Sequence, residues 1–303
     1  MRLLFNYLIF PGFLFSACIG LMAGWIDRKV TARIQWRVGP PWYQNFVDII
    51  KLLGKETIVP ETAKLTFLFA PFLGLLSLVL ATTILGKAFI LPSESFLGDL
   101  IVILYLLIIP AIAIIVGAFS SRNPLASIGA SREMKLVLAY ELPFILSIIV
   151  VLIKCQGAIQ IGSILNHQIN FGPNLASVSG MVAFIVAILC MQAKLGLVPF
   201  DASEAEQEIM AGALIEYSGL PLAIFRLSKA VLLYTTPLLL ITLFWAKDLS
   251  PFSLVGKYIT LLVIIILIKN TNPRLRIDQA VKFFWGPVTF LALAAVVLAV
   301  FGL

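Results

Sequence analysis

The chain has 303 residues, of which 61% are hydrophobic and 12% charged, with a mean hydropathy of +1.05 and a formal net charge of +7. A soluble domain carries about 25% charged residues, so this composition excludes a water-soluble fold and requires lipid to cover much of the apolar surface. The basic residues cluster in loops beside apolar runs, as in the cytoplasmic loops of membrane proteins, and we therefore expect no nucleic acid as a partner.

Eight apolar stretches are long enough to cross a bilayer, since about 20 helical residues span the hydrocarbon core. We therefore predict an all-α polytopic membrane protein that forms one transmembrane domain over residues 1–303. The first stretch is uncharged and is followed by bases, which favours a signal-anchor over a cleaved signal peptide. The predicted spans are Leu4 to Ile26, Leu65 to Gly86, Leu100 to Phe119, Leu136 to Ile153, Ser177 to Ala193, Leu220 to Trp245, Pro251 to Ile268 and Phe283 to Leu303.

The loops give the chain a predicted orientation. Most Lys and Arg residues fall in the odd-numbered loops, which predicts that these loops are cytoplasmic and that both termini are extracytoplasmic. In the first loop, the stretch "WYQNFVDIIKLLGKE" has apolar residues at helical spacing and charges elsewhere. This pattern predicts an amphipathic helix along the membrane interface, ending near Gly54.

Three charged residues fall within or near the predicted spans, where an ionised side chain costs roughly 2.5 to 3.5 kcal/mol on insertion scales. Glu141, in "AYELPF", lies roughly 9 Å deeper than Lys135 at helical rise. Pro143 beside it favours a break lined by protein or water. Arg226 and Lys229 share one face of the sixth helix. Together these residues predict a polar route for protons or ions.

The segment "PFDASEAEQEIMAGALIEYSG" (199–219) is the densest group of acids in the chain. A helix would place Glu204 and Glu208 on one face, and an extended segment would add Glu206 to them. Either way, like charges in scarce water raise one another's pKa, and some could exchange protons near neutral pH. A solvated acidic loop is the competing interpretation. The acids are Asp201, Glu204, Glu206, Glu208 and Glu216.

Metal and haem sites are not expected in this chain. Cys18, Cys155 and Cys190 are far apart, and His167 is the only histidine. Structural zinc and iron–sulfur clusters take about four ligands that lie close together, and a haem held between two membrane histidines needs a second histidine. We predict no metal, no cofactor and no self-contained catalytic centre here.

The acidic segment resembles "PFD-x-x-EAE-x-E-x-x-AG-x-x-x-EYSG" of the H-type membrane subunit of respiratory complex I and of group 4 membrane-bound nickel–iron hydrogenases. Three other stretches agree with this family: "DRKVTARIQWRVGPPWYQNFVDIIKLLGKE", "NPLASIGASREMKLVLAYELPF" and "NPRLRIDQ". Quinone-using members usually carry a longer "GPN-R-x-GP-x-G-x-LQ" in the first loop. The compact run here resembles the hydrogenase branch.

The resemblance implies a role for each group of site residues. The five acids match the coupling region beneath the last iron–sulfur cluster, and Glu141 matches the fourth-helix glutamate of the polar channel leading away from it. Docking or loop-ordering roles are implied, less specifically, for a further set that ordinary surface anchoring would also explain. That set is Arg33, Arg37, Asp48, Arg274 and Arg276.

The resemblance also implies a function in a larger assembly. We expect a non-catalytic membrane-anchor and coupling subunit of a complex I-like, ferredoxin-linked hydrogenase or sulfur-reducing complex, which docks the redox arm and links electron transfer to proton or sodium translocation. Expected partners are peripheral iron–sulfur and nickel–iron-type subunits, which would hold the clusters and the nickel–iron site, and antiporter-like membrane subunits. The expected location is the plasma membrane of an archaeon or bacterium.

Three rival functions remain open at this point. One is a quinone-binding subunit of an oxidoreductase that uses NADH or a reduced deazaflavin. Another is a stand-alone secondary ion transporter, which the lack of an internal repeat disfavours. The third is a purely structural anchor, in which the carboxylates only bind the basic surface of a partner.

Overall fold

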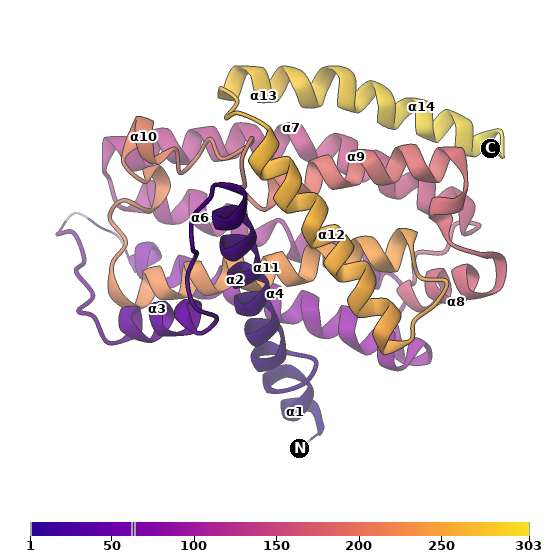
Figure 1. Cartoon of the computed structure of the whole chain (residues 1–303), viewed down its shortest axis with the longest axis horizontal. Coiled ribbons are helices and arrows are strands. Elements are labelled where there is room, and N and C mark those ends of the chain that lie inside the picture. The colour runs from indigo at the N-terminus through magenta and orange to yellow at the C-terminus, as the bar shows by residue number, and fades with distance from the viewer. Residues whose placement is uncertain (1, 62, 64, 303) are drawn as a thin grey trace.

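The computed structural model describes residues 2–61, 63 and 65–302, and within them it contains helices and no strand (Figure 1). Long apolar runs favour helices because lipid offers no partner for free backbone groups. The α-helices are α1 (Arg2–Leu8), α2 (Phe13–Ile34), α3 (Gln44–Leu53), α4 (Leu65–Ile90), α5 (Asp99–Leu106), α6 (Ile109–Ser120), α7 (Pro124–Lys154), α8 (Ile161–Phe171), α9 (Val178–Lys194), α10 (Glu206–Ile209), α11 (Gly219–Phe244), α12 (Pro251–Thr271), α13 (Ile277–Phe283) and α14 (Thr289–Val300). Short 3₁₀ turns are η1 (Pro92–Glu94), η2 (Asn174–Ala176) and η3 (Gly212–Leu214), and Phe284–Val288 is a π-helix.

The predicted all-α membrane fold is confirmed. In the described part of the chain, seven helical stretches are long and apolar enough to cross a membrane, and the shorter α9 covers the remaining predicted span. The 17 residues of α9 give a length of about 25 Å. The predicted interfacial helix is α3, followed by Gly54 at its C-cap.

Several predicted boundaries differ from the structure. The first span is two helices separated at residues 9–12, and its second helix, α2, continues to Ile34. Helix α7 begins twelve residues before the predicted Leu136, where the Asn123 side chain accepts the Leu125 N–H at 2.8 Å. The predicted break at Pro143 is wrong, because α7 runs through it. Other spans are interrupted instead. The third predicted span is two helices, α5 and α6, separated at residues 107–108. The last span contains a π-helix with Pro287, where the Thr289 hydroxyl donates to the Phe284 carbonyl at 2.6 Å.

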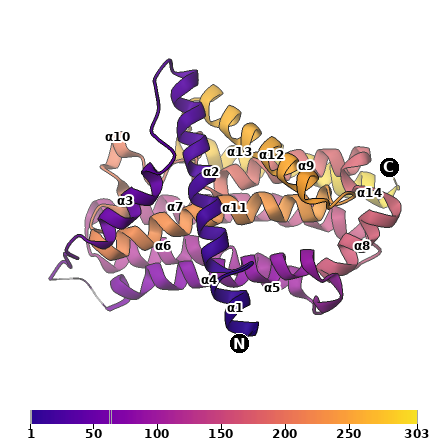
Figure 2. The ribbon, with the colours of Figure 1, turned by 60° about the horizontal axis from the view of Figure 1, so that its bottom comes forward.

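Helix α11 is the centre of the bundle and is almost entirely buried. It packs against α2, α3, α4, α8, α9 and α12, while α2 and α12 cross the bundle obliquely (Figures 1 and 2). Gly20 lets the backbones of α2 and α11 come into contact, since a Cβ at Gly20 would lie 2.1 Å from the carbonyl oxygen of Ala230 in α11. Small residues at such crossings are the usual means of close helix association in membranes.

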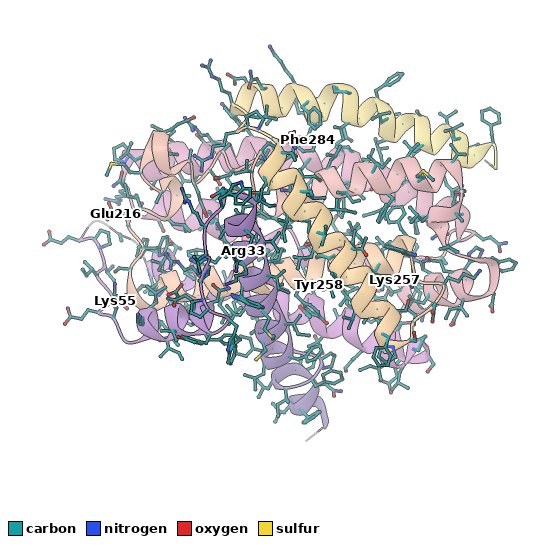
Figure 3. The ribbon with its side chains drawn as sticks, viewed as in Figure 1. Arg33, Lys55, Glu216, Lys257, Tyr258 and Phe284 are labelled. Atoms are coloured by element: carbon teal, nitrogen blue, oxygen red, sulfur yellow. The ribbon has the colours of Figure 1, made fainter. Side chains whose placement is uncertain are left out.

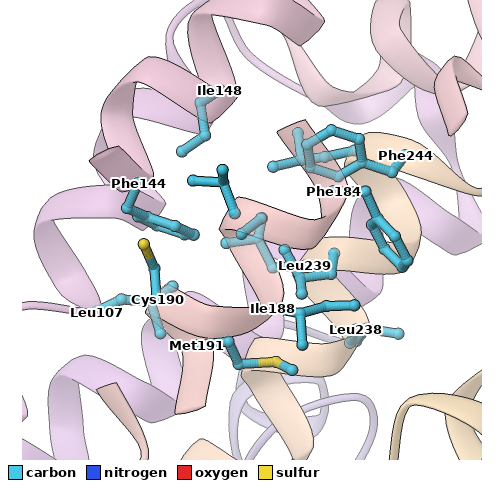
Figure 4. Packing of buried hydrophobic residues seen from close by; sticks show 14 of the residues in the cluster. Leu107, Phe144, Ile148, Phe184, Ile188, Cys190, Met191, Leu238, Leu239 and Phe244 are labelled. Carbon is cyan, nitrogen blue, oxygen red and sulfur yellow. The ribbon is translucent and has the colours of Figure 1, made fainter. Parts of the chain in front are cut away.

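The largest apolar cluster extends through most of the bundle, and Figure 4 shows part of it, to which α7, α9 and α11 contribute. Phe144 of α7, Phe184 of α9 and Phe244 of α11 belong to it, together with Leu, Ile and Ala side chains. The Phe184 and Phe244 rings are tilted, with centroids 5.5 Å apart. This packing fixes the three helices that carry the charged groups described below.

We expect Gly20→Ala to weaken the α2–α11 crossing, because the added methyl group meets backbone that cannot rotate away. Overpacking of this kind costs about 1–3 kcal/mol. The thermal unfolding midpoint of the purified protein in mild detergent should fall. Gly256→Ala is the matched control, since nothing lies within 4 Å of a Cβ at that helical position. Equal midpoints for the two variants would contradict the prediction.

Candidate functional site

The acid-rich segment lies in residues 195–218, here called loop five, which joins α9 to α11. Gly129 of α7 makes room for it, since a Cβ there would lie 2.5 Å from the Ala213 nitrogen and 2.9 Å from the Ser203 carbonyl oxygen. Tyr217 anchors its far end by donating to the Phe67 carbonyl at 3.0 Å and stacking on the Phe67 ring. Loop five is therefore a folded segment seated on α7.

The backbone of loop five is neither a long helix nor an extended strand, so neither predicted conformation describes it. It contains the short helix α10, then three successive residues with positive φ: Met210 at 50°, Ala211 at 72° and Gly212 at 50°. A non-glycine residue in this region costs about 1–3 kcal/mol and persists only where surrounding contacts enforce it. The ion pairs of this segment supply such contacts.

Each described carboxylate of loop five has its own partner from another element. Asp201 pairs with Arg274 before α13, Glu204 pairs with Lys229 of α11, and Glu208 pairs with Arg132 of α7 at 2.7 Å. Glu216 accepts a hydrogen bond from Asn123 at 2.5 Å. The side chain of Glu206 lies outside the described part of the structure. Asp201, Glu204 and Glu208 are thus each paired with a base from another element.

Burial and pairing act in opposite directions on the pKa values of Asp201 in loop five and of Asp48 in α3. Burial raises the pKa of Asp201 above its ordinary value, although the Arg274 guanidinium works against that rise. For Asp48 of α3, burial also works to raise the pKa, but hydrogen bonds from Arg28 and Gln44 outweigh it and the pKa is lowered. Asp201 is therefore held closer to the point of taking up a proton than Asp48.

Glu141 pairs with Lys194 of α9, with Oε1 and Nζ 2.7 Å apart. The Lys194 side chain is 3% exposed, and its ammonium lies over the rings of Tyr140 and Phe144, 5.5 and 4.9 Å from their centroids. The rings and the carboxylate together compensate an ammonium that lipid could not solvate. The buried Glu141 predicted from the sequence thus has a buried cation beside it.

A cavity of about 440 Å³, here called the outer cavity, lies between α2, α3, α11 and loop five. Arg226 and Lys229 both line it, so the structure brings them together with loop five. Arg28 pairs with Asp48 across it, and Lys269 pairs with Asp27 at 2.7 Å. Eight charged side chains line this cavity: Asp27, Arg28, Asp48, Asp201, Glu204, Arg226, Lys229 and Lys269.

The predicted docking residues form two groups. Asp48 and Arg274 are engaged in the ion pairs above, whereas Arg33, Arg37 and Arg276 are exposed. Trp36, which lies between Arg33 and Arg37 in the sequence, is 98% exposed. Figure 3 shows Glu216 and Lys55 at one end of the bundle, with Lys257 nearer the opposite end. Glu216, at the far end of loop five, therefore lies at the same end of the molecule as Lys55.

Sequence reasoning missed several charged residues of this site: Asp27, Arg28, Arg132 and Lys269, which form ion pairs described above, and the more buried Glu133 and Lys194. Glu133 of α7 is only 7% exposed and faces loop five, where the Ser203 hydroxyl hydrogen-bonds to it. Lys194 was counted only as a loop base. Helical spacing could have found Glu133, because it lies seven residues before Tyr140 and so shares a helix face with it. No group of three or more His, Cys, Asp or Glu side chains among the described residues is arranged to hold a metal ion.

Comparison with known proteins agrees with this fold and site. Residues 7–300 match the family model "NADH dehydrogenase". The chain is 33% identical to the H-type subunit of the NADH-quinone oxidoreductase of Thermomicrobium roseum, over 96% of this chain and 94% of that protein. It is 31% identical to the corresponding protein of Dehalococcoides mccartyi strain CBDB1, over 91% and 80% respectively.

The fold of this chain is also similar to that of a protein whose structure has been solved. The chain superimposes on a chain of the membrane-bound sulfane sulfur reductase, an archaeal respiratory membrane complex, with a TM-score of 0.90 and 31% identity, covering 99% of this chain and 100% of that one. The fold and charged site thus define a multi-pass membrane protein of the H type. The chain belongs to the NADH dehydrogenase family of complex I-like membrane subunits.

We expect Arg274→Gln to raise the pKa of Asp201 further, because it removes the cation that favours the charged carboxylate and leaves the burial that disfavours it. The carboxyl group should then take up its proton at higher pH. Infrared titration of protein with ¹³C-labelled aspartate measures this shift. Arg274→Lys keeps the charge and serves as control. A pKa that falls or stays constant in Arg274→Gln would contradict the assignment.

Proposed function

We propose that this chain is the non-catalytic membrane-anchor and coupling subunit of a ferredoxin-linked, complex I-like hydrogenase or sulfur-reducing complex. It docks a peripheral arm of iron–sulfur and nickel–iron-type subunits at the loop five end. It then links electron transfer in that arm to proton or sodium movement through antiporter-like membrane subunits. The likeness to a chain of an archaeal sulfane sulfur reductase supports this branch.

The observation that carries the proposal is a series of ion pairs running from exposed to buried. Glu208 and Arg132 stand at the exposed end, with the Glu208 side chain 56% exposed. Glu204 and Lys229 are intermediate, and the Lys194 side chain of the Lys194–Glu141 pair is 3% exposed. Because charges interact more strongly where water is scarce, a change of charge at the exposed end is felt along this series.

The outer cavity bears on the rival function of a quinone-binding subunit. Its volume of about 440 Å³ is within the range of small-molecule sites. Its lining combines apolar side chains such as Leu21, Ile49 and Leu233 with eight charged ones. The isoprenoid tail of a quinone would displace water from these ion pairs and offer no polar group in its place. The charged lining therefore favours the hydrogenase or sulfur-reducing branch.

The composition of the native assembly tests the partner proposal. We expect extraction in mild detergent through a tag on this chain to recover iron–sulfur and nickel–iron-type subunits together with antiporter-like subunits. Charge reversal of the exposed Arg33 and Arg37 should release the peripheral subunits and leave the membrane subunits attached. Recovery of the chain alone from gently solubilised membranes would remove the proposal.

Glu141→Gln in the assembled complex tests the coupling proposal. The substitution keeps the size of the side chain but leaves the buried Lys194 ammonium without its anion. We expect electron transfer to continue while ion translocation, measured in sealed vesicles, is lost. Asp278→Asn, which changes an exposed carboxylate of α13 in the same way, is the control. Full ion translocation by Glu141→Gln would exclude Glu141 from the route.

A further inference from the structure

A second, smaller cavity lies deeper than the outer cavity. This inner cavity has a volume of about 40 Å³ and shares Leu195, Gly196, Glu204 and Lys229 with the outer one. Its remaining charged lining residues are Glu133 and Lys194. A cavity of this size has room for about three water molecules when polar groups line it. It therefore extends from the Glu204–Lys229 pair to the Lys194 ammonium, which is itself paired with Glu141.

Glu133 is the member of this group without a cation of its own in the described part of the chain. It lines the inner cavity together with one lysine from each pair, Lys229 and Lys194. Among the described residues it forms no ion pair, and its hydrogen-bond partner is the neutral Ser203 hydroxyl. A buried carboxylate with no cation of its own is costly when ionised.

Counting charges around the inner cavity indicates where a proton resides. Two ammonium groups, Lys194 and Lys229, are paired with Glu141 and Glu204. Glu133 is a third carboxylate for these two cations. One proton shared among the three acids makes the group neutral. The geometry assigns that proton to Glu133, since the other two acids already have cations.

We propose that Glu133 holds the proton of this group and passes it between the two ion pairs, a role that rests on the proposed coupling function. When Glu204 takes up a proton from the outer cavity, Lys229 loses its anion. Glu133 then releases its proton through the inner cavity to Lys194, which gives one of its own protons to Glu141, 2.7 Å away, and the Glu133 anion pairs with Lys229. The O–H bond of Glu133 breaks, an O–H bond of Glu141 forms, and Lys194 loses one N–H bond and gains one. Lys194 is left beside a neutral Glu141.

Infrared difference spectroscopy of the assembled complex, oxidised against dithionite-reduced, tests this role directly. We expect the wild type to show a redox-dependent carbonyl band of a protonated carboxylic acid. The band should be lost in Glu133→Gln, and it should shift in Glu133→Asp and in Ser203→Ala. It should be kept in the control Glu94→Gln, which changes an exposed carboxylate distant from Glu133 in the sequence. Co-purification of the partner subunits shows that each variant is assembled.

Ion translocation in sealed vesicles provides the second measurement. Glu133→Gln should keep electron transfer and lose ion translocation, and Glu133→Asp should restore part of it. A band that persists in assembled Glu133→Gln, or its absence from the wild type, would overturn the inference. If Glu141→Gln is uncoupled while Glu133→Gln pumps normally, only this inference fails. If both variants pump normally, the proposed coupling function fails as well.

Discussion

The structure depends on the compensation of charge where water is scarce. An ion brought into a low-dielectric region needs a close partner, because the loss of hydration costs several kcal/mol per ion. Here the partners come from separate helices: Arg132 and Glu141 from α7, Lys194 from α9 and Lys229 from α11. The same contacts that neutralise the charges therefore also fix loop five to the bundle. The same residues therefore serve both the packing of the fold and the charge balance of the candidate site.

The membrane fold could be predicted because apolar length is a local property of the sequence. The ends of the helices could not be predicted in this way, because a charged residue interrupts an apolar run while the helix itself continues. The start of α7 shows this: the predicted span begins at Leu136, yet the helix begins at Pro124 and already contains Arg132 and Glu133. A long helix can carry charges in its first turns when a neighbouring segment covers them, and loop five covers these. Similarly, Pro143 did not break α7, because an intact bundle holds the helix on both sides of it.

The candidate site was only partly predictable for a related reason. Local spacing identified the loop five acids and Glu141 as unusual, but it could not assign their partners, which lie far away in the sequence. Asp201 and Arg274, for example, are 73 residues apart. The sequence therefore suggested that like charges raise one another's pKa, whereas for Asp201 the first cause of the raised pKa is burial. Glu133 was missed because its covering partner, Ser203, belongs to another segment.

The packing of loop five bears on how a signal from a docked arm would travel. A rigid-body shift of the loop would have to carry Ser203 and Ala213 across α7, where Gly129 already leaves no space for a methyl group. It would also have to release the positive-φ residues Met210 and Ala211 from the contacts that enforce them. By contrast, moving a proton among Glu204, Glu133 and Glu141 requires only side-chain motion around a small cavity. Tight packing of the backbone and a third carboxylate beside two lysines therefore favour transfer of charge over displacement of the loop.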